Sequence, residues 1–202
     1  VNTPYAMLCD NDDIPTKELG RCVAFLEASP AYVCASGRIQ GFHMWPDPLT
    51  GPHSAVTKLY SPYDTPAVYC QGTANERVLE GFANSWSYYA VYRTEALRTI
   101  RDEVCELGLT NLQVHEKFCA MRTLTLGQAV CFPYYTTLYR QHGTGSGAQW
   151  KPPDRWEMGQ VLTAMECEGI PPVPLRDLWL EWYDTRDRYF RSPVRKAITK
   201  VA

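Results

Sequence analysis

The chain has 202 residues, of which 45% are hydrophobic and 12% aromatic, and its formal net charge is -2. This balance excludes an intrinsically disordered chain, and the length is sufficient for one substantial core or two small ones. The longest stretch without a charged residue, 123–139, is too short and too polar to cross a bilayer. We therefore expect a globular protein with no transmembrane segment.

The N-terminal part of the chain predicts an extended segment followed by a helix. Residues 1–13 carry no helical periodicity, and a helix is predicted from about Thr16 to Ala28, before Pro30. The chain begins at Val1 and not at Met, so we expect a processed N-terminus. Together with many cysteines, this favours an intracellular location, for which a mitochondrial complex is one example.

Residues 38–72 have a different composition from the rest of the chain. Five prolines alternate here with aromatic residues, so a long helix is excluded and a central strand is disfavoured. A loop of this length in a compact domain is usually functional or bound to another molecule. We predict an extended arm that wraps over a surface and is held there by its aromatic side chains.

A single long helix is predicted for residues 74–107. Thr73 and Glu76 have the T-x-x-E spacing of a capping box, and Gly108 stands where a left-handed C-terminal cap is expected. Apolar residues recur at steps of three and four, although Arg93 interrupts them. The predicted rod is about 50 Å long.

The second half of the chain predicts further helices and one strand candidate. Thr110 and Gln113 offer a second capping box for a helix that ends at about Leu124, and residues 132–139 are the best strand candidate. Residues 143–153 form a linker rich in glycine and proline. Two helices are predicted after it, at about 154–169 and 174–190.

These elements predict a mainly α-helical protein with little or no sheet. Helical hairpins would surround the long central helix, with extended segments rich in proline and aromatic residues. We expect an N-terminal helical body, 1–142, which includes the arm 38–72 and the helix 74–107. The linker 143–153 would join it to a C-terminal helical hairpin with a basic tail, 154–202.

The eight cysteines show no C-x-x-C spacing, and most of them lie on apolar faces of predicted helices. We interpret them as buried thiols in a reducing compartment. The alternative is an enzyme that depends on cysteine or on a metal. His115 and Cys119 stand four residues apart on a predicted helix, which is the geometry of half a metal site. A packed cysteine beside a histidine that is already hydrogen-bonded is the simpler explanation of the pair, so no metal and no cofactor are expected.

Two further groups of charged residues stand out in the sequence. The paired carboxylates Asp102–Glu103 and Glu166–Glu168 lie on helix faces that we interpret as solvated. The tail from Arg186 onward holds six Lys or Arg and one Asp. Its charge suits an acidic protein surface, anionic lipid or RNA, and a helical RNA-binding module is a second alternative function.

The leading hypothesis from the sequence is a non-enzymatic accessory subunit of a large multiprotein assembly. Extended aromatic segments and the absence of a recognisable catalytic motif favour this hypothesis over an enzyme. Other subunits would be its partners. The residues that we expect to bind them are Trp45, Tyr60 and Tyr63 in the arm, and Arg191, Arg195, Lys196 and Lys200 in the tail.

Overall fold

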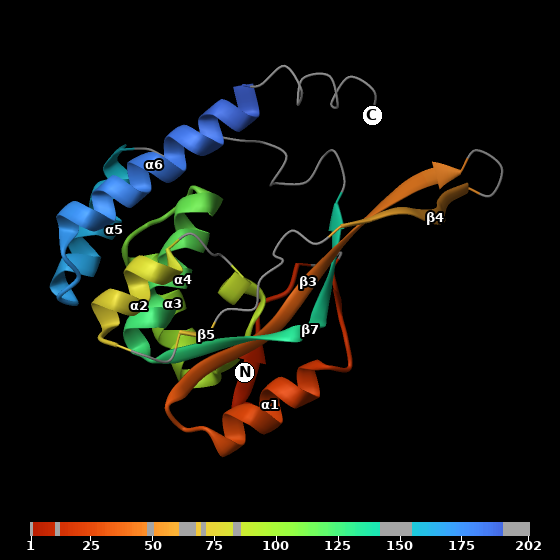
Figure 1. Ribbon diagram of the computed structural model, residues 1–202, viewed down its shortest axis with the longest axis horizontal. Helices are drawn as coiled ribbons and strands as arrows, with labels where there is room; N and C mark the ends of the chain where they lie inside the picture. Colours follow the sequence, from red (N-terminus) through yellow and green to blue (C-terminus); the bar gives the residue numbers. More distant parts are fainter. Residues whose placement is uncertain are drawn as a thin grey trace.

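The computed structural model describes most of the chain (Figure 1). The described residues are 2–10, 13–47, 51–60, 68–69, 72–82, 86–141 and 155–191. For 43–47, 51–60, 68–69, 86, 141 and 186–191, only the backbone is described.

A curved, mixed, seven-stranded sheet forms the centre of the fold. Its main path has the order β1-β6-β3-β7-β2, while β4 pairs with β3 and β5 pairs with β7. The β3–β7 pair is parallel, and every other described pair is antiparallel. The strands are β1 (Tyr5–Met7), β2 (Ile14–Pro15), β3 (Tyr32–Asp47), β4 (Gly51–Tyr60), β5 (Val68–Tyr69), β6 (Val91–Arg93) and β7 (Gln128–Gln141).

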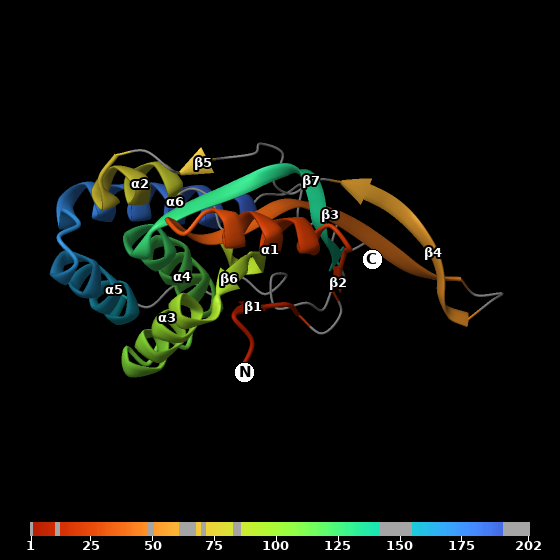
Figure 2. The ribbon, with the colours of Figure 1, turned by 90° about the horizontal axis from the view of Figure 1, so that it is seen from below.

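Helices cover both faces of this sheet. One helix lies on one face, and the other helices gather on the opposite face (Figures 1 and 2). They are α1 (Leu19–Ala28), α2 (Ala74–Gly81), the 3-10 helix η1 (Trp86–Tyr89), α3 (Thr94–Glu106), α4 (Leu112–Leu126), α5 (Arg155–Cys167) and α6 (Pro172–Arg191). The prediction of a mainly α-helical protein with little or no sheet is therefore wrong.

The predicted long helix, 74–107, is also wrong, although both of its ends were placed correctly. The capping box at Thr73 and Glu76 is formed, and Gly108 has a φ of 63°. Between these ends the chain makes α2, η1, β6 and α3 as separate elements. Residues 86–92 carry no charge, and Tyr92 of β6 is 1% exposed. Tyr92 is buried because it lies between the neighbouring strands of the sheet and α4, where its hydroxyl contacts that of Thr123. Tertiary burial therefore overrides the helical periodicity.

Arg93, which interrupts the apolar pattern, marks the point at which the strand β6 becomes the helix α3. Its backbone is extended at the N-cap position of α3. Its guanidinium donates to the carbonyl oxygens of Tyr32 at 2.9 Å and Leu26 at 2.5 Å. The Leu26 carbonyl belongs to the last turn of α1, where carbonyl groups lack helical partners. Arg93 thus joins the start of α3 to the end of α1.

Strand β3 contradicts the expectation that this region makes a poor central strand. It pairs with β7 along one side, and with β6 and then β4 along the other. Pro46 is tolerated because the β3–β4 register shifts between Trp45 and Asp47, which leaves the proline outside the ladder. Pro46 also lies past the last β3–β7 pair, His43↔Gln141, so β7 does not need its missing amide.

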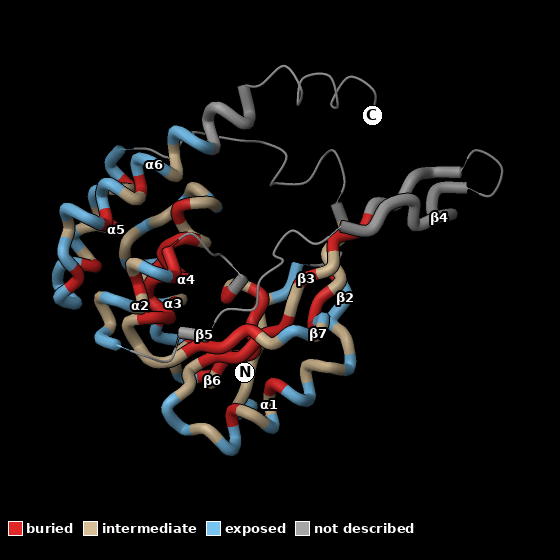
Figure 3. The backbone as a smooth tube through the Cα atoms, viewed as in Figure 1, coloured by how far each residue is buried: buried red, intermediate tan, exposed pale blue. Residues whose placement is uncertain are grey.

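Alternating side chains divide the interior into two cores, as the two-residue period of a strand requires. Cys34 and Ala129 belong to the larger core under α2, α4, α5 and α6, while Ala35 and Val130 belong to the smaller core under α1. Buried residues follow β3, β7 and α4 through the centre of the molecule (Figure 3).

Helix α4 takes the central position that the sequence assigned to residues 74–107. It is capped by Asn111, whose side chain accepts from the amides of Gln113 and Val114, and not by the predicted box at Thr110. Residues 117–124 of α4 are all buried, so this helix is covered from every side.

The C-terminal helices α5 and α6 pack onto the rest of the fold through the larger core. Trp179 of α6 is fully buried, and its ring centroid lies 5.7 Å from that of Phe82. The predicted linker, 143–153, lies outside the described residues. The division into two parts at this linker therefore stays a prediction.

Candidate functional site

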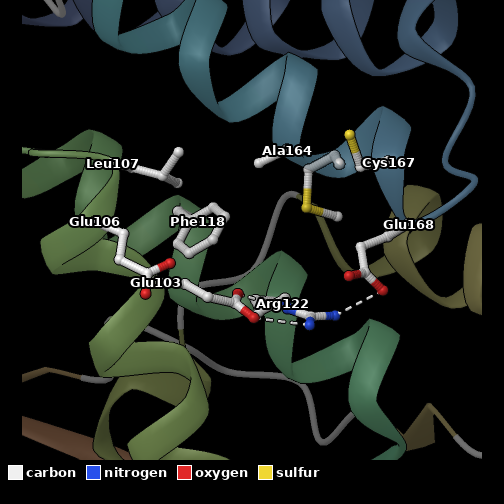
Figure 4. A pocket seen from close by; sticks show the side chains of 9 residues that line it. Glu103, Glu106, Leu107, Phe118, Arg122, Ala164, Cys167 and Glu168 are labelled. Carbon is white, nitrogen blue, oxygen red and sulfur yellow. Dashed lines mark hydrogen bonds and ion pairs between the residues drawn. The ribbon is translucent and has the colours of Figure 1, made fainter.

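A cavity of about 240 Å³ lies between α3, α4 and α5. Its wall combines buried apolar side chains with charged ones, which Figure 4 shows from close by. The lining residues are Glu103, Glu106 and Leu107 from the end of α3, Phe118 and Arg122 from α4, Ala164, Met165 and Cys167 from α5, and Glu168 just after α5.

Arg122 organises the charged side of this cavity. Its side chain is 10% exposed and binds Glu103 through two contacts, Nε–Oε2 at 2.6 Å and Nη2–Oε1 at 2.8 Å. Its Nη1 lies 2.9 Å from Glu168 Oε2 and donates to the hydroxyl of Thr125 at 2.7 Å. The hydrogen bonds to Glu103 raise the pKa of Arg122, against the opposing effect of burial. The guanidinium therefore joins three helices as a fixed positive charge.

Three glutamates line the cavity, Glu103, Glu106 and Glu168, so its acidic side chains outnumber the single cation Arg122. Glu103 and Glu106 stand three residues apart on α3, which places them on the same face of the helix. Glu106 is exposed and has no hydrogen bond or ion pair in the part of the chain that the structure describes. The cavity thus combines an apolar wall with a negatively charged mouth, a combination that suits a cation with an apolar body.

Little in the sequence indicates this site. Glu103 and Glu168 were interpreted as residues on solvated helix faces, whereas both bind Arg122. The available signal was Arg122 itself, because it is the lone charged residue in the otherwise uncharged stretch 118–126. A lone charge on a buried helix requires a partner. The sequence does not show which distant carboxylate provides it.

A second polar contact that the sequence does not predict joins Glu157 of α5 to the start of α4. Glu157 of α5 is 5% exposed, and its carboxylate accepts from the amide of Thr110 at 3.1 Å and from the amide of Asn111 at 3.1 Å. The Thr110 hydroxyl donates to the same carboxylate at 2.5 Å. An acidic side chain from another helix thus satisfies the amides at the start of α4, where the helix dipole also favours negative charge.

The predicted pair His115 and Cys119 lies on α4 next to η1. The Nη1 atom of Arg101 is 2.7 Å from Nε2 of His115, and the Tyr88 ring packs edge-on against the imidazole. Burial and then the charge of Arg101 lower the pKa of His115, while burial raises the pKa of Cys119 to about 12. Within the described ranges, no three His, Cys, Asp or Glu residues gather as a metal site would require. The pair stays a prediction.

The buried thiols are poorly suited to nucleophilic catalysis. Burial raises the pKa of Cys34, and it also raises the pKa of Cys22 despite a contact with the Tyr134 hydroxyl. A thiol that stays protonated at neutral pH is a weak nucleophile. Cys70 lies outside the described residues.

Two of the predicted partner-binding residues lie on the β3–β4 hairpin. Trp45 of β3 pairs with Ala55 of β4, and Tyr60 of β4 pairs with Gly41, so Trp45 and Tyr60 lie on the same hairpin. This hairpin projects away from the helices in both views (Figures 1 and 2). Arg191 is the last residue of α6. The other predicted positions, Tyr63, Arg195, Lys196 and Lys200, lie outside the described residues.

No protein-family model and no curated protein sequence matches this chain. Among the described residues, no helix is both long enough and apolar enough to cross a membrane.

Proposed function

We propose that the protein is a non-enzymatic subunit of a multiprotein assembly and that the β3–β4 hairpin binds a neighbouring subunit. The observation that carries this proposal is the outer part of the hairpin, 44–47 with 51–56, which we call the distal ribbon. The last pair between β3 and β7 is His43↔Gln141, and beyond it the described strand partner of β3 is β4 alone.

The distal ribbon requires support from outside the described fold. A two-stranded hairpin is marginally stable in water, because two strands alone bury little apolar surface. The ribbon projects away from both cores (Figure 2). Contact with another protein subunit would supply the missing apolar burial.

The composition of the distal ribbon suits contact with a protein. Residues 44–56 contain one acidic residue, Asp47, and no Lys or Arg. Trp45 is an aromatic residue of the kind enriched at protein interfaces. Pro46 and Pro52 lack amide donors, which disfavours the addition of a further strand at either edge. We therefore propose a contact made by side chains and not by strand pairing.

The test compares two tryptophan substitutions in the full chain expressed in its native cell. We expect Trp45→Ala to lose the neighbouring subunit during native purification, because it removes the largest side chain of the distal ribbon. The matched control is Trp156→Ala, which removes the same side chain from an exposed position on α5. Thermal unfolding of both purified variants checks that neither has lost its fold.

A photo-crosslinking amino acid at position 45 identifies the neighbour directly. We expect one predominant protein adduct from this position and none from position 95, an exposed position on α3. The proposal is wrong if position 45 gives no adduct in the native cell and Trp45→Ala purifies with the same proteins as the unmodified chain.

A further inference from the structure

The cavity between α3, α4 and α5 has a volume that suits one long side chain. Pockets that enclose drug-sized molecules occupy about 300–1,000 Å³, whereas this cavity measures about 240 Å³. Leu107, Phe118, Ala164 and Met165 contribute apolar groups to its wall. A chain of methylene groups could bury its surface against these side chains.

The charge at the mouth selects a cation over an anion. Three carboxylates and one guanidinium line the cavity. The guanidinium of Arg122 is already engaged through Nε, Nη1 and Nη2 by Glu103, Thr125 and Glu168. An anion would therefore find the hydrogen-bonding groups of Arg122 already engaged, and the carboxylates would repel it. A cation would meet Glu106, which has no ionic partner within the described residues.

We propose that this cavity receives a basic side chain, arginine or lysine, from a partner protein. The methylene stem would lie between Leu107 and Ala164, and the cationic head would pair with Glu106 at the mouth. This docking point is separate from the distal ribbon, so it does not depend on the function proposed above.

The lining itself provides a reporter of occupancy. Cys167 lines the cavity and is exposed, whereas Cys9 is exposed near the N-terminus and does not line it. The probe is N-acetyl-L-arginine amide, a blocked arginine with the stem and head of a side chain. We expect it to slow the alkylation of Cys167 by iodoacetamide severalfold at saturation, and to leave the rate at Cys9 unchanged. Mass spectrometry of the full chain measures both rates.

Two comparisons test the chemistry of the interaction. N-acetyl-citrulline amide has the same shape without the charge, and we expect no protection of Cys167 from it. Glu106→Gln should raise the probe concentration needed for half-protection by about two- to fivefold, because it removes the ionic partner of the head group. The control Glu166→Gln makes the same change at an exposed α5 position outside the lining, and should shift this concentration less than twofold.

A third variant tests the apolar wall. Ala164→Leu adds a larger side chain to the cavity, and we expect it to weaken protection by the probe without removing any charge. The proposal is overturned if the arginine probe does not protect Cys167, if the citrulline analogue protects it equally, or if Glu106→Gln and Glu166→Gln behave alike. Each of these results would leave the proposal for the distal ribbon standing.

Discussion

Gly37 of β3 lies close against the backbone of β7, and the absence of a side chain there is a packing requirement. A Cβ atom at this position would overlap the carbonyl oxygen of Tyr134 and lie 2.8 Å from the γ-methyl of Thr136. The Gly37 amide donates to the Thr136 hydroxyl at 3.0 Å. The register between β3 and β7 shifts at this point, so glycine permits the irregularity that keeps the two long strands paired.

We expect Gly37→Ala to lower the free energy of unfolding by at least about 3 kcal/mol, because backbone must move to admit the methyl group. The control is Gly159→Ala on α5, where a Cβ meets nothing within 4 Å. That change should stabilise the protein by about 0.5–1 kcal/mol, since alanine is the better helix former. Urea unfolding followed by circular dichroism measures both. Equal midpoints for the two variants would contradict the close approach at Gly37.

The described cysteines fall into two groups that differ in access to solvent. Cys9, Cys105 and Cys167 are exposed, while the buried thiols are Cys22, Cys34, Cys119 and Cys131. Burial withholds a thiol from reagents and, as at Cys119, raises its pKa. A structural role in the core explains the buried group.

Alkylation at about pH 8 should therefore modify Cys9, Cys105 and Cys167 first. The four buried thiols should react only after denaturation, and peptide mass spectrometry with and without urea separates the two groups. A buried thiol that reacts faster than the exposed ones would contradict this assignment and would favour the cysteine-dependent enzyme instead.

At the scale of elements, Arg122 of α4 connects helices through ion pairs. It binds Glu103 of α3 and Glu168 after α5 in one network, and it is largely excluded from water. The ion pair between Arg98 and Glu95 is different, because both side chains are at least half exposed and belong to the same helix. Loss of the ion pairs of Arg122 should therefore lower the free energy of unfolding more than loss of the ion pair of Arg98.

We expect Arg122→Met to cost about 2–4 kcal/mol of unfolding free energy, because it leaves two carboxylates without their cation. This expected loss of unfolding free energy is smaller than the loss for a fully buried ion pair, since the Glu168 side chain is 42% exposed. Arg98→Met should change the unfolding free energy by less than about 0.5 kcal/mol. Denaturant titrations at low and high salt measure both. A loss at Arg122 no larger than that at Arg98 would show that the network contributes no net stability.

How far the sequence predicts these elements depends on where their stabilising contacts lie. The capping box at Thr73 and the left-handed conformation of Gly108 depend on residues close by in the sequence, and both predictions are confirmed. Strand β7 was found in part, through its aromatic residues and threonines. Strand β3 was missed, because its ladders are formed with residues far away in the chain. The contacts of Arg122 were missed for the same reason, since Glu103 and Glu168 are not its neighbours in sequence.

At the scale of the whole molecule, the helices on both sides of the predicted linker contribute to one core. Val161, Met165, Leu175 and Trp179 from α5 and α6 belong to the same cluster as Phe118 of α4. All five side chains are at most 1% exposed. Removing α5 and α6 would expose the face of α4 that they cover.

A chain shortened to residues 1–153 tests this organisation. We expect it to lose cooperative unfolding, because the larger core would lose Trp179 and its neighbours without replacement. Calorimetry and near-ultraviolet circular dichroism compare it with the full chain. A shortened chain that unfolds cooperatively at the same temperature would instead support two independent domains, as the linker at 143–153 suggests.

The parallel pairing of β3 with β7 has a consequence for how the polypeptide acquires its fold during synthesis. Tyr32 meets Gln128, so the principal ladder of the sheet closes a loop that contains α2, α3 and α4. Such non-local pairing is slow to form, and it begins only once the later strand has left the ribosome. Until then the backbone N–H and C=O groups of β3 that pair with β7 have no strand partner. Nascent chains halted before residue 128 should consequently be the species that chaperones bind most strongly.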